Sequence, residues 1–210
     1  LRDIRRRPGM NADARTIAVY DTAARRYRDR GTARWEVEAL DAFLARLPPN
    51  GYVLDLGCGP GHHAAHIAAS GRRVDPVDAS DGMVELARQR GLPARQARFD
   101  QISGKALYDG IWANFTLLHA PRGDVPGHLA RLHAALKPGG VIHVGFKVGS
   151  GQGRDSLDRF YTWWEVDDMH AALAEAGFIV DEDIRRGKST GLDSSPFGWA
   201  LMTATRKDDT

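Results

Sequence analysis

The sequence predicts an α/β protein, built as one domain on a mostly parallel sheet with helices on both faces. Apolar segments of strand length alternate with longer segments of helical periodicity along most of the 210 residues. The first of these strands runs directly into a turn with glycine at alternate positions. The composition, 42% hydrophobic and 27% charged, is typical of a globular domain, and the length allows a sizeable core.

Two helices are expected before the first strand, over residues 11–30 and 34–47. The second is predicted from apolar side chains that recur at helical spacing, namely Trp35, Val37, Leu40, Phe43, Leu44 and Leu47. The turn sequence Pro48-Pro49-Asn50-Gly51 ends it.

Strands and helices then alternate. The predicted strands cover residues 52–56, 73–78, 94–99, 108–114, 141–147, 178–184 and 199–205. The predicted helices cover residues 61–70, 81–90, 125–136 and 165–176. Ser80 is expected to cap the helix that follows it, and Pro138 with two glycines to end the helix before it. Pro76 lies inside the second strand, where a missing N–H favours a bulge or a local edge.

Charge is distributed unevenly along the chain. The net charge is +2, whereas residues 1–30 hold nine Arg and four Asp. Such a basic arm is typical of nucleic-acid binding and also of a solvated terminus. Residues 1–10 are expected to be a disordered arm, either native or introduced by cloning, that precedes the domain at residues 11–210.

The cellular setting follows from cysteine use and hydropathy. The single cysteine, Cys58, excludes an internal disulfide and favours a reducing, cytoplasmic compartment. We find no apolar run long enough to span a bilayer and no secretory signal, so no membrane association is expected.

The stretch VLDLGCGPG at residues 53–61 carries the strongest ligand signal. Ligands of open α/β sheets bind at the carboxyl ends of the strands, and glycine there lets the backbone approach them closely. Asp78 ends the second strand, 17 residues beyond Gly61. A carboxylate at that place accepts hydrogen bonds from ribose hydroxyls. A nucleoside-containing ligand is therefore predicted.

Two classes of nucleoside ligand compete for this loop. A dinucleotide loop, G-x-G-x-x-G, would need its last glycine at His62, whereas the glycines here alternate. Asp55, inside the strand, would place negative charge beside a pyrophosphate but suits a cationic or amino-bearing ligand. A nicotinamide-dependent Rossmann oxidoreductase remains the alternative.

The order of segments resembles that of class I S-adenosylmethionine-dependent methyltransferases. VLDLGCGPG and VDPVDAS resemble their first two motifs, ARFDQI the adenine-facing segment, and YDGIWANFTLLHAP with LHAALKPGGVIHVGF the fourth and fifth. The likeness covers roughly residues 17–180 and is closest to small bacterial proteins of the tellurite-resistance type. It implies a single Rossmann-like domain on a seven-stranded sheet with an antiparallel last strand. It also implies S-adenosylmethionine as cofactor and S-adenosylhomocysteine as product.

The resemblance also implies the residues that bind this cofactor. They are Tyr27 near the methionine carboxylate, Gly57, Cys58, Gly59 and Gly61 under the methionine and ribose, Asp78 at the ribose, Ala79 and Met83 beside the adenine, Phe99, Asp100 and Gln101 at the adenine edge, and Asn114 and Phe115 near the methyl group. Met83 as plain core and Tyr27 as simple packing are the alternatives.

An acceptor site is expected next to the donor. His119 is the candidate general base, because the pKa of histidine lies near the working pH; a purely structural role is the alternative. Residues 149–164, GSGQGRDSLDRFYTWW, are expected to form a mobile acceptor lid whose aromatic and guanidinium groups supply stacking and anion recognition. The predicted acceptor-binding residues are Tyr20, Arg154, Arg159, Tyr161, Trp163 and Trp164.

The predicted function is methyl transfer to an oxygen or nitrogen of a small molecule. The chain lacks the Asn/Asp-Pro-Pro-aromatic signature of enzymes that methylate nucleobase amino groups, and its near-neutral charge argues against a nucleic-acid partner. Two further functions compete with this prediction, namely RNA methylation and donor binding without catalysis. No metal is expected, since His62 and His66 lack a third ligand, and Cys58 has no activating partner. A monomer or homodimer is expected.

Overall fold

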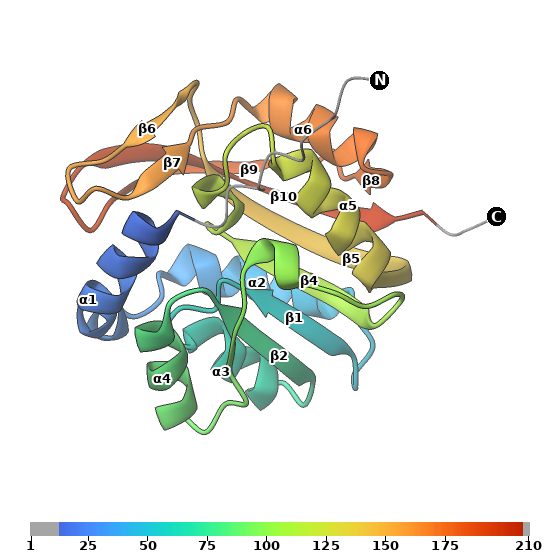
Figure 1. Cartoon of the computed structure of the whole chain (residues 1–210). Helices are drawn as coiled ribbons and strands as arrows, with labels where there is room; N and C mark the ends of the chain where they lie inside the picture. The colour runs from blue at the N-terminus through green and yellow to red at the C-terminus, as the bar shows by residue number, and fades with distance from the viewer. Residues whose placement is uncertain (1–12, 208–210) are drawn as a thin grey trace, which may run out of the picture.

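The computed structural model describes residues 13–207, which form a central sheet flanked by helices (Figure 1). The predicted arm at residues 1–10 lies outside the described residues. The helices are α1 (Ala14–Arg30), α2 (Arg34–Ala45), α3 (His62–Ala69), α4 (Asp81–Gln89), α5 (Val125–Ala135) and α6 (Val166–Glu175), with 3-10 turns η1 (Phe99–Gln101) and η2 (Leu117–His119). The strands are β1 (Tyr52–Leu56), β2 (Arg73–Asp78), β3 (Arg95–Gln96), β4 (Tyr108–Asn114), β5 (Leu136–Lys147), β6 (Gln152–Arg154), β7 (Phe160–Thr162), β8 (Phe178–Val180), β9 (Arg185–Thr190) and β10 (Pro196–Arg206).

The main sheet confirms the predicted fold class. Its order is β3-β2-β1-β4-β5-β10-β8, with β9 pairing on β10. Strands β1 to β5 run parallel to one another, and β10 is antiparallel to β5. The order reverses between β1 and β4, which is where ligands of doubly wound sheets bind.

Three strands, β6, β7 and β9, were not predicted from the sequence. β9, with the sequence RRGKST, makes the main sheet eight-stranded, and it alternates between half-buried and exposed residues without an apolar face. β6 and β7 form a separate antiparallel hairpin inside the segment predicted to be a mobile lid. Polar side chains hide the period-2 signal in β9, and β6 and β7 are three residues each, too short to show it.

Other boundaries shift by a few residues. The predicted strand at 94–99 shortens to β3 and continues into η1, and the strand at 178–184 ends at Val180. β5 begins at Leu136, so Pro138 lies in the strand rather than ending a helix. Pro76 faces Asp55 of β1, and β3 pairs with β2 only from Val77 onward. The proline therefore lies at a local edge, which explains why the missing N–H is tolerated.

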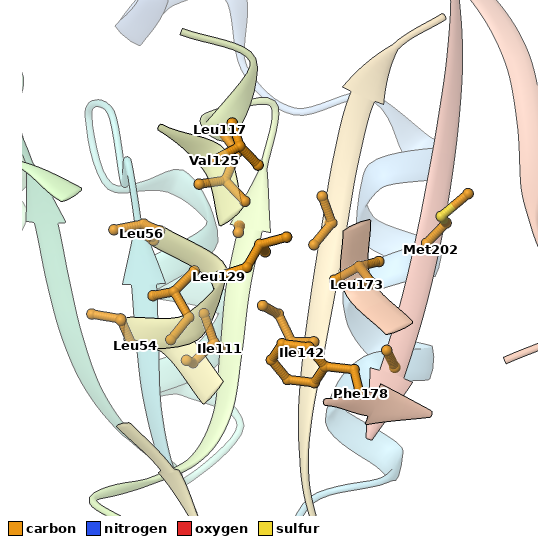
Figure 2. Close-up of a cluster of buried hydrophobic side chains, with 14 of the residues drawn as sticks. Leu54, Leu56, Ile111, Leu117, Val125, Leu129, Ile142, Leu173, Phe178 and Met202 are labelled. Atoms are coloured by element: carbon orange, nitrogen blue, oxygen red, sulfur yellow. The ribbon is translucent and has the colours of Figure 1, made fainter. Parts of the chain in front are cut away.

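Apolar side chains cover both faces of the sheet. On one face, Leu54 and Ile111 of the central strands pack with Leu129 of α5 and Leu173 of α6 (Figure 2). On the other face, α2 contributes a separate cluster that contains Phe43 and Trp112. Because both faces are covered, a ligand is expected at the carboxyl ends of the strands.

Candidate functional site

A cavity of about 410 Å³ lies at this carboxyl edge. Residues of α1 and of the loop between β9 and β10 contribute to its lining. Most of the predicted site residues line it: Tyr20, Tyr27, Gly57, Cys58, Gly59, Asp78, Ala79, Met83, Phe99, Asn114, Phe115, His119, Arg159 and Tyr161. The structure thus brings together side chains from residues 20 to 161 of the chain.

Six predicted site residues do not line the cavity. Gly61 precedes α3 with φ 84°, and a Cβ there would lie 2.6 Å from Leu92, so this glycine serves helix packing. Asp100 and Gln101 belong to η1, where the Gln101 amide oxygen accepts from the Arg98 N–H at 2.8 Å.

The other three belong to the predicted lid. Trp164 is buried in the main core, with the Arg122 guanidinium 4.1 Å above its ring. Trp163 stacks on Tyr161 with ring centres 6.0 Å apart. Arg154 pairs with Asp13 at 2.8 Å. These contacts place the three side chains outside the cavity lining.

The glycine loop has the backbone conformation that its sequence predicts. Gly57 and Gly59 have φ of 73° and 54°, a region that L side chains rarely adopt. A Cβ at Gly57 would lie 2.2 Å from the Thr116 hydroxyl. The N–H groups of Gly57 and Cys58 both donate to the Val77 carbonyl, at 2.8 and 2.9 Å. Bare backbone is therefore held rigidly against the cavity.

Asp78 connects this loop to the end of β2. One carboxylate oxygen accepts from the Gly59 N–H and the other from the Ser80 N–H, both at 2.9 Å. Burial raises its pKa, and these backbone N–H groups oppose that shift. Each oxygen keeps a second lone pair that can accept from a ligand hydroxyl.

Asp55 lies directly behind the loop and is 1% exposed. Its Oδ2 has no hydrogen-bond partner among the described residues. Burial, reinforced by the charge of Asp78, raises its pKa to about 8. The carboxyl is therefore largely neutral at pH 7, and a nearby positive charge would favour its ionisation.

Glu36 of α2 is a cavity residue that the sequence reasoning missed. Its carboxylate accepts from the Asn114 amide at 3.3 Å and from the Ala33 N–H at 2.9 Å. Gly145 leaves room for the Asn114 side chain, since a Cβ there would lie 2.2 Å from the amide oxygen. An acidic residue at the third position of a helix is usually interpreted as a capping residue. The sequence pattern therefore gave no reason to place Glu36 in the cavity.

His119 is held by hydrogen bonds on both ring nitrogens. Nδ1 lies 2.7 Å from the Phe160 carbonyl, which can only accept, so this nitrogen carries the proton. Nε2 therefore accepts from the Tyr20 hydroxyl, also at 2.7 Å. Burial lowers the pKa of His119 to about 4. The imidazole is therefore neutral at pH 7. Its Nε2 is occupied by the hydrogen bond from the Tyr20 hydroxyl, which also lines the cavity.

The segment 149–164 is a hairpin docked on α1. The Thr16 hydroxyl accepts from the Phe160 N–H at 2.8 Å, and Arg15 pairs with Asp158 at 2.6 Å. Arg159 is buried, pairs with Asp155 and donates to the Tyr27 hydroxyl. Helix α1 and the hairpin lie side by side (Figure 1), and both contribute residues to the cavity lining.

Two further expectations concern metal and membrane. Among residues 13–207, no group of three or more His, Cys, Asp or Glu is arranged to hold a metal ion. Burial raises the pKa of the Cys58 thiol. Within the same residues, no helix combines the length and the apolar character required to cross a bilayer.

The part of the chain that contains the glycine loop is similar to a known protein family. Residues 53–140 match the family model of a methyltransferase domain. The matched residues are 88 of the 210 in the chain. They include β1 with its glycine loop, Asp78 and the end of β4, which are the parts that supply most of the cavity floor.

Curated relatives match between about half and two thirds of this chain. The chain is 38% identical over 109 residues to trans-aconitate 2-methyltransferase of Paracidovorax citrulli, covering 49% of this chain and 42% of that one. It is 32% identical over 134 residues to malonyl-[acyl-carrier protein] O-methyltransferase of Serratia marcescens, covering 63% and 49%. The chain thus spans about half the length of these relatives.

Solved structures share the fold over most of the chain. The 1,6-didemethyltoxoflavin-N1-methyltransferase of Burkholderia thailandensis has a TM-score of 0.73 and 24% identity, covering 93% of this chain and 88% of that one. A methyltransferase structure from Methanosarcina mazei has a TM-score of 0.71 and 13% identity, covering 80% and 98%. These likenesses concern the fold, and they confirm the predicted Rossmann-like arrangement.

Proposed function

We propose that the protein transfers a methyl group from S-adenosylmethionine to an oxygen or nitrogen of a small-molecule acceptor. The observation that carries the proposal is the carboxylate of Asp78, which binds the Gly59 N–H at the end of β2. It faces the same cavity as the left-handed glycine loop. Bare backbone beside a ribose-binding carboxylate suits a nucleoside whose remaining part lies flat on the loop.

The donor would be held by residues of three kinds. Asp78 binds the ribose hydroxyls, and Ala79, Met83 and Phe99 form the adenine pocket. Gly57, Cys58 and Gly59 support the methionine. Tyr27, which accepts from the Arg159 guanidinium, lies where it can hold the methionine carboxylate. The unpartnered oxygen of Asp55 fits a ligand that brings positive charge to this end of the sheet.

Positioning is the main chemical task of the chain. When bound, S-adenosylmethionine supplies an electrophilic methyl carbon on a sulfonium and leaves as S-adenosylhomocysteine, so no enzyme nucleophile is needed. The protein aligns the acceptor's lone pair and excludes water under α1, and such alignment contributes about 7–11 kcal/mol to lowering a barrier. We assign to the Tyr20–His119 pair the orientation of the acceptor, with Tyr20 as the contacting group. A pKa of about 4 makes His119 a weak proton acceptor at pH 7, so the reason given for expecting a general base does not hold in the fold.

The names of the relatives support both acceptor atoms. Two relatives are named for trans-aconitate and for O-methylation of a malonyl group, and a structural neighbour is named as an N1-methyltransferase. These names concern those proteins, so the acceptor of this chain remains part of the proposal. The narrower likeness to tellurite-resistance-type proteins stays a prediction, as do a cytoplasmic location and a monomeric or homodimeric state.

Calorimetric titration tests the donor assignment directly. We expect S-adenosylhomocysteine to bind with one site per chain and NADH to show no heat above dilution. Binding of NADH without binding of the adenosyl nucleoside would overturn the proposal in favour of an oxidoreductase. Transfer of a radiolabelled methyl group to a fraction of small metabolites, with RNA as a parallel acceptor, then identifies the acceptor class.

A further inference from the structure

A buried lysine lies in the cavity two strands away from the glycine loop. Lys147 is the last residue of β5 and is 9% exposed. Its Nζ lies 4.1 Å from the centre of the Tyr161 ring and 4.5 Å from that of Phe197. Within residues 13–207 the ammonium donates no hydrogen bond to an acceptor atom and forms no ion pair. Aromatic faces attract the charge but leave its strong donors unused.

The charges around Lys147 do not neutralise it. Burial, followed by the positive charge of Arg159, lowers its pKa, and Arg30 acts in the same direction. Two acids oppose this shift, but each is engaged elsewhere. Asp155 pairs with Arg159, and Asp193 accepts from the Ser195 hydroxyl at 2.6 Å. A buried ammonium without a counterion costs several kcal/mol, so this part of the cavity favours an anion.

Aromatic side chains connect this lysine to the end of β4. The Phe115 ring lies edge-on to Phe197 with centres 6.2 Å apart, and edge-on to Trp35 at 6.0 Å. Trp35 is fixed in turn by stacking on Trp199 at 4.3 Å. Trp35, Phe115 and Phe197 all line the cavity, and we call them the aromatic wall. A wall of this kind suits a flat or apolar carbon skeleton.

We infer that Lys147 binds a carboxylate of the methyl acceptor, whose carbon skeleton packs on the aromatic wall. The substrate class is therefore small organic acids with an unsaturated or aromatic body. This inference rests on the proposed function, because it takes the cavity beside the glycine loop to be the donor site. The competing reading, in which Lys147 holds the methionine carboxylate of the donor, is one outcome of the test.

The test compares binding of an acid with that of its neutral amide. trans-Cinnamate and trans-cinnamamide are titrated calorimetrically into the protein saturated with S-adenosylhomocysteine, and the nucleoside is titrated separately. Lys147→Met removes the charge at similar volume, and Lys147→Arg keeps it. Lys188→Met is the matched control, because Lys188 is an exposed lysine of β9 outside the cavity lining. Thermal unfolding checks that each variant is folded.

We expect cinnamate to bind at least tenfold more tightly than the amide. Lys147→Met should abolish this difference, while Lys147→Arg and Lys188→Met retain it and nucleoside affinity stays within twofold. Equal binding of acid and amide, no binding of either, or loss of nucleoside affinity in Lys147→Met would overturn the inference. Failure of the proposed function looks different: the nucleoside does not bind even the unaltered protein, while the acid–amide difference and its dependence on Lys147 are still measurable.

Discussion

The two halves of the cavity are built in different ways. The proposed donor half is centred on the backbone of Gly57 and Gly59 and the carboxylate of Asp78, which come from about twenty residues in sequence. Side chains are added around this centre by Tyr27, Ala79, Met83 and Phe99. The acceptor half, around Lys147 and the aromatic wall, is made of side chains from α2, β5, β7 and β10. Backbone geometry fixes what the first half can bind, whereas side-chain identity sets the second. The donor half is thus suited to one ligand, whereas substitutions of side chains in the acceptor half can alter which acceptor binds.

The largest expected effect comes from a substitution that disrupts the backbone of the glycine loop at Gly57. Gly57→Ala should reduce nucleoside binding below detection and destabilise the fold, because the new Cβ meets Thr116 at a φ of 73°. Gly71→Ala is the matched control: Gly71 has φ 83° but nothing within 4 Å of its Cβ position, so only backbone strain, on the order of 1 kcal/mol, is expected. Urea unfolding and calorimetry measure both. Equal losses in the two variants would mean that strain, not the contact, matters at Gly57.

A second change removes the carboxylate and leaves the backbone in place. Asp78→Ala should weaken nucleoside binding by roughly 100-fold, as expected when hydrogen bonds to a charged group worth about 1.5–3 kcal/mol are lost. Asp81→Ala, three residues on at the start of α4 and outside the cavity lining, should leave the affinity unchanged. Near-normal affinity in Asp78→Ala would defeat the ribose assignment.

A third change tests the electrostatics behind the loop. The pKa of Asp55 is raised to about 8 in the fold, against about 3.9 in the unfolded chain. The unfolded state therefore ionises first, and the contribution of Asp55 to stability falls as pH rises from about 4 to 8. We expect the stability of Asp55→Asn relative to the unaltered protein to increase steadily between pH 5 and 8. A flat difference in urea midpoints across that range would show that Asp55 is ionised in the free protein.

The smallest expected effect concerns the ion pair that joins α1 to the hairpin. Arg15 and Asp158 form an exposed pair, with Arg15 64% exposed, so Arg15→Ala should change the free energy of unfolding by less than about 1 kcal/mol. Any change in KM should concern the acceptor more than the donor, since the hairpin contributes Tyr161 to the acceptor half. A larger loss of donor affinity would contradict the division of the cavity drawn above.

The same division explains what the sequence could predict. β1, β2 and β4 match their predicted bounds, and the glycine loop with Asp78 lies where the local pattern indicates. Local motifs carry this information because one strand and the turn after it dictate the geometry.

The acceptor half offered no comparable signal. Glu36 lies at the start of a helix and Lys147 at the end of a buried strand. Phe197 lies in β10, which begins at Pro196, three residues before its predicted start. Trp164 was interpreted as a ligand contact because it is aromatic and follows a glycine-rich segment, yet it fills the core. Only the sheet order, which pairs β5 with β10, brings these distant residues together.

Because α1 lines the cavity, the way it is attached should affect how ligands are exchanged. α1 is joined to α2 through Gly31, which has φ 69° and free space around it, while two surface ion pairs and one backbone contact fasten its other end to the hairpin. Dissolved ions screen such surface pairs over distances of about 8–10 Å at ordinary ionic strength. Added salt should therefore loosen this attachment and speed exchange of the acceptor more than of the nucleoside, so that turnover would depend on the electrolyte as well as on the chemistry.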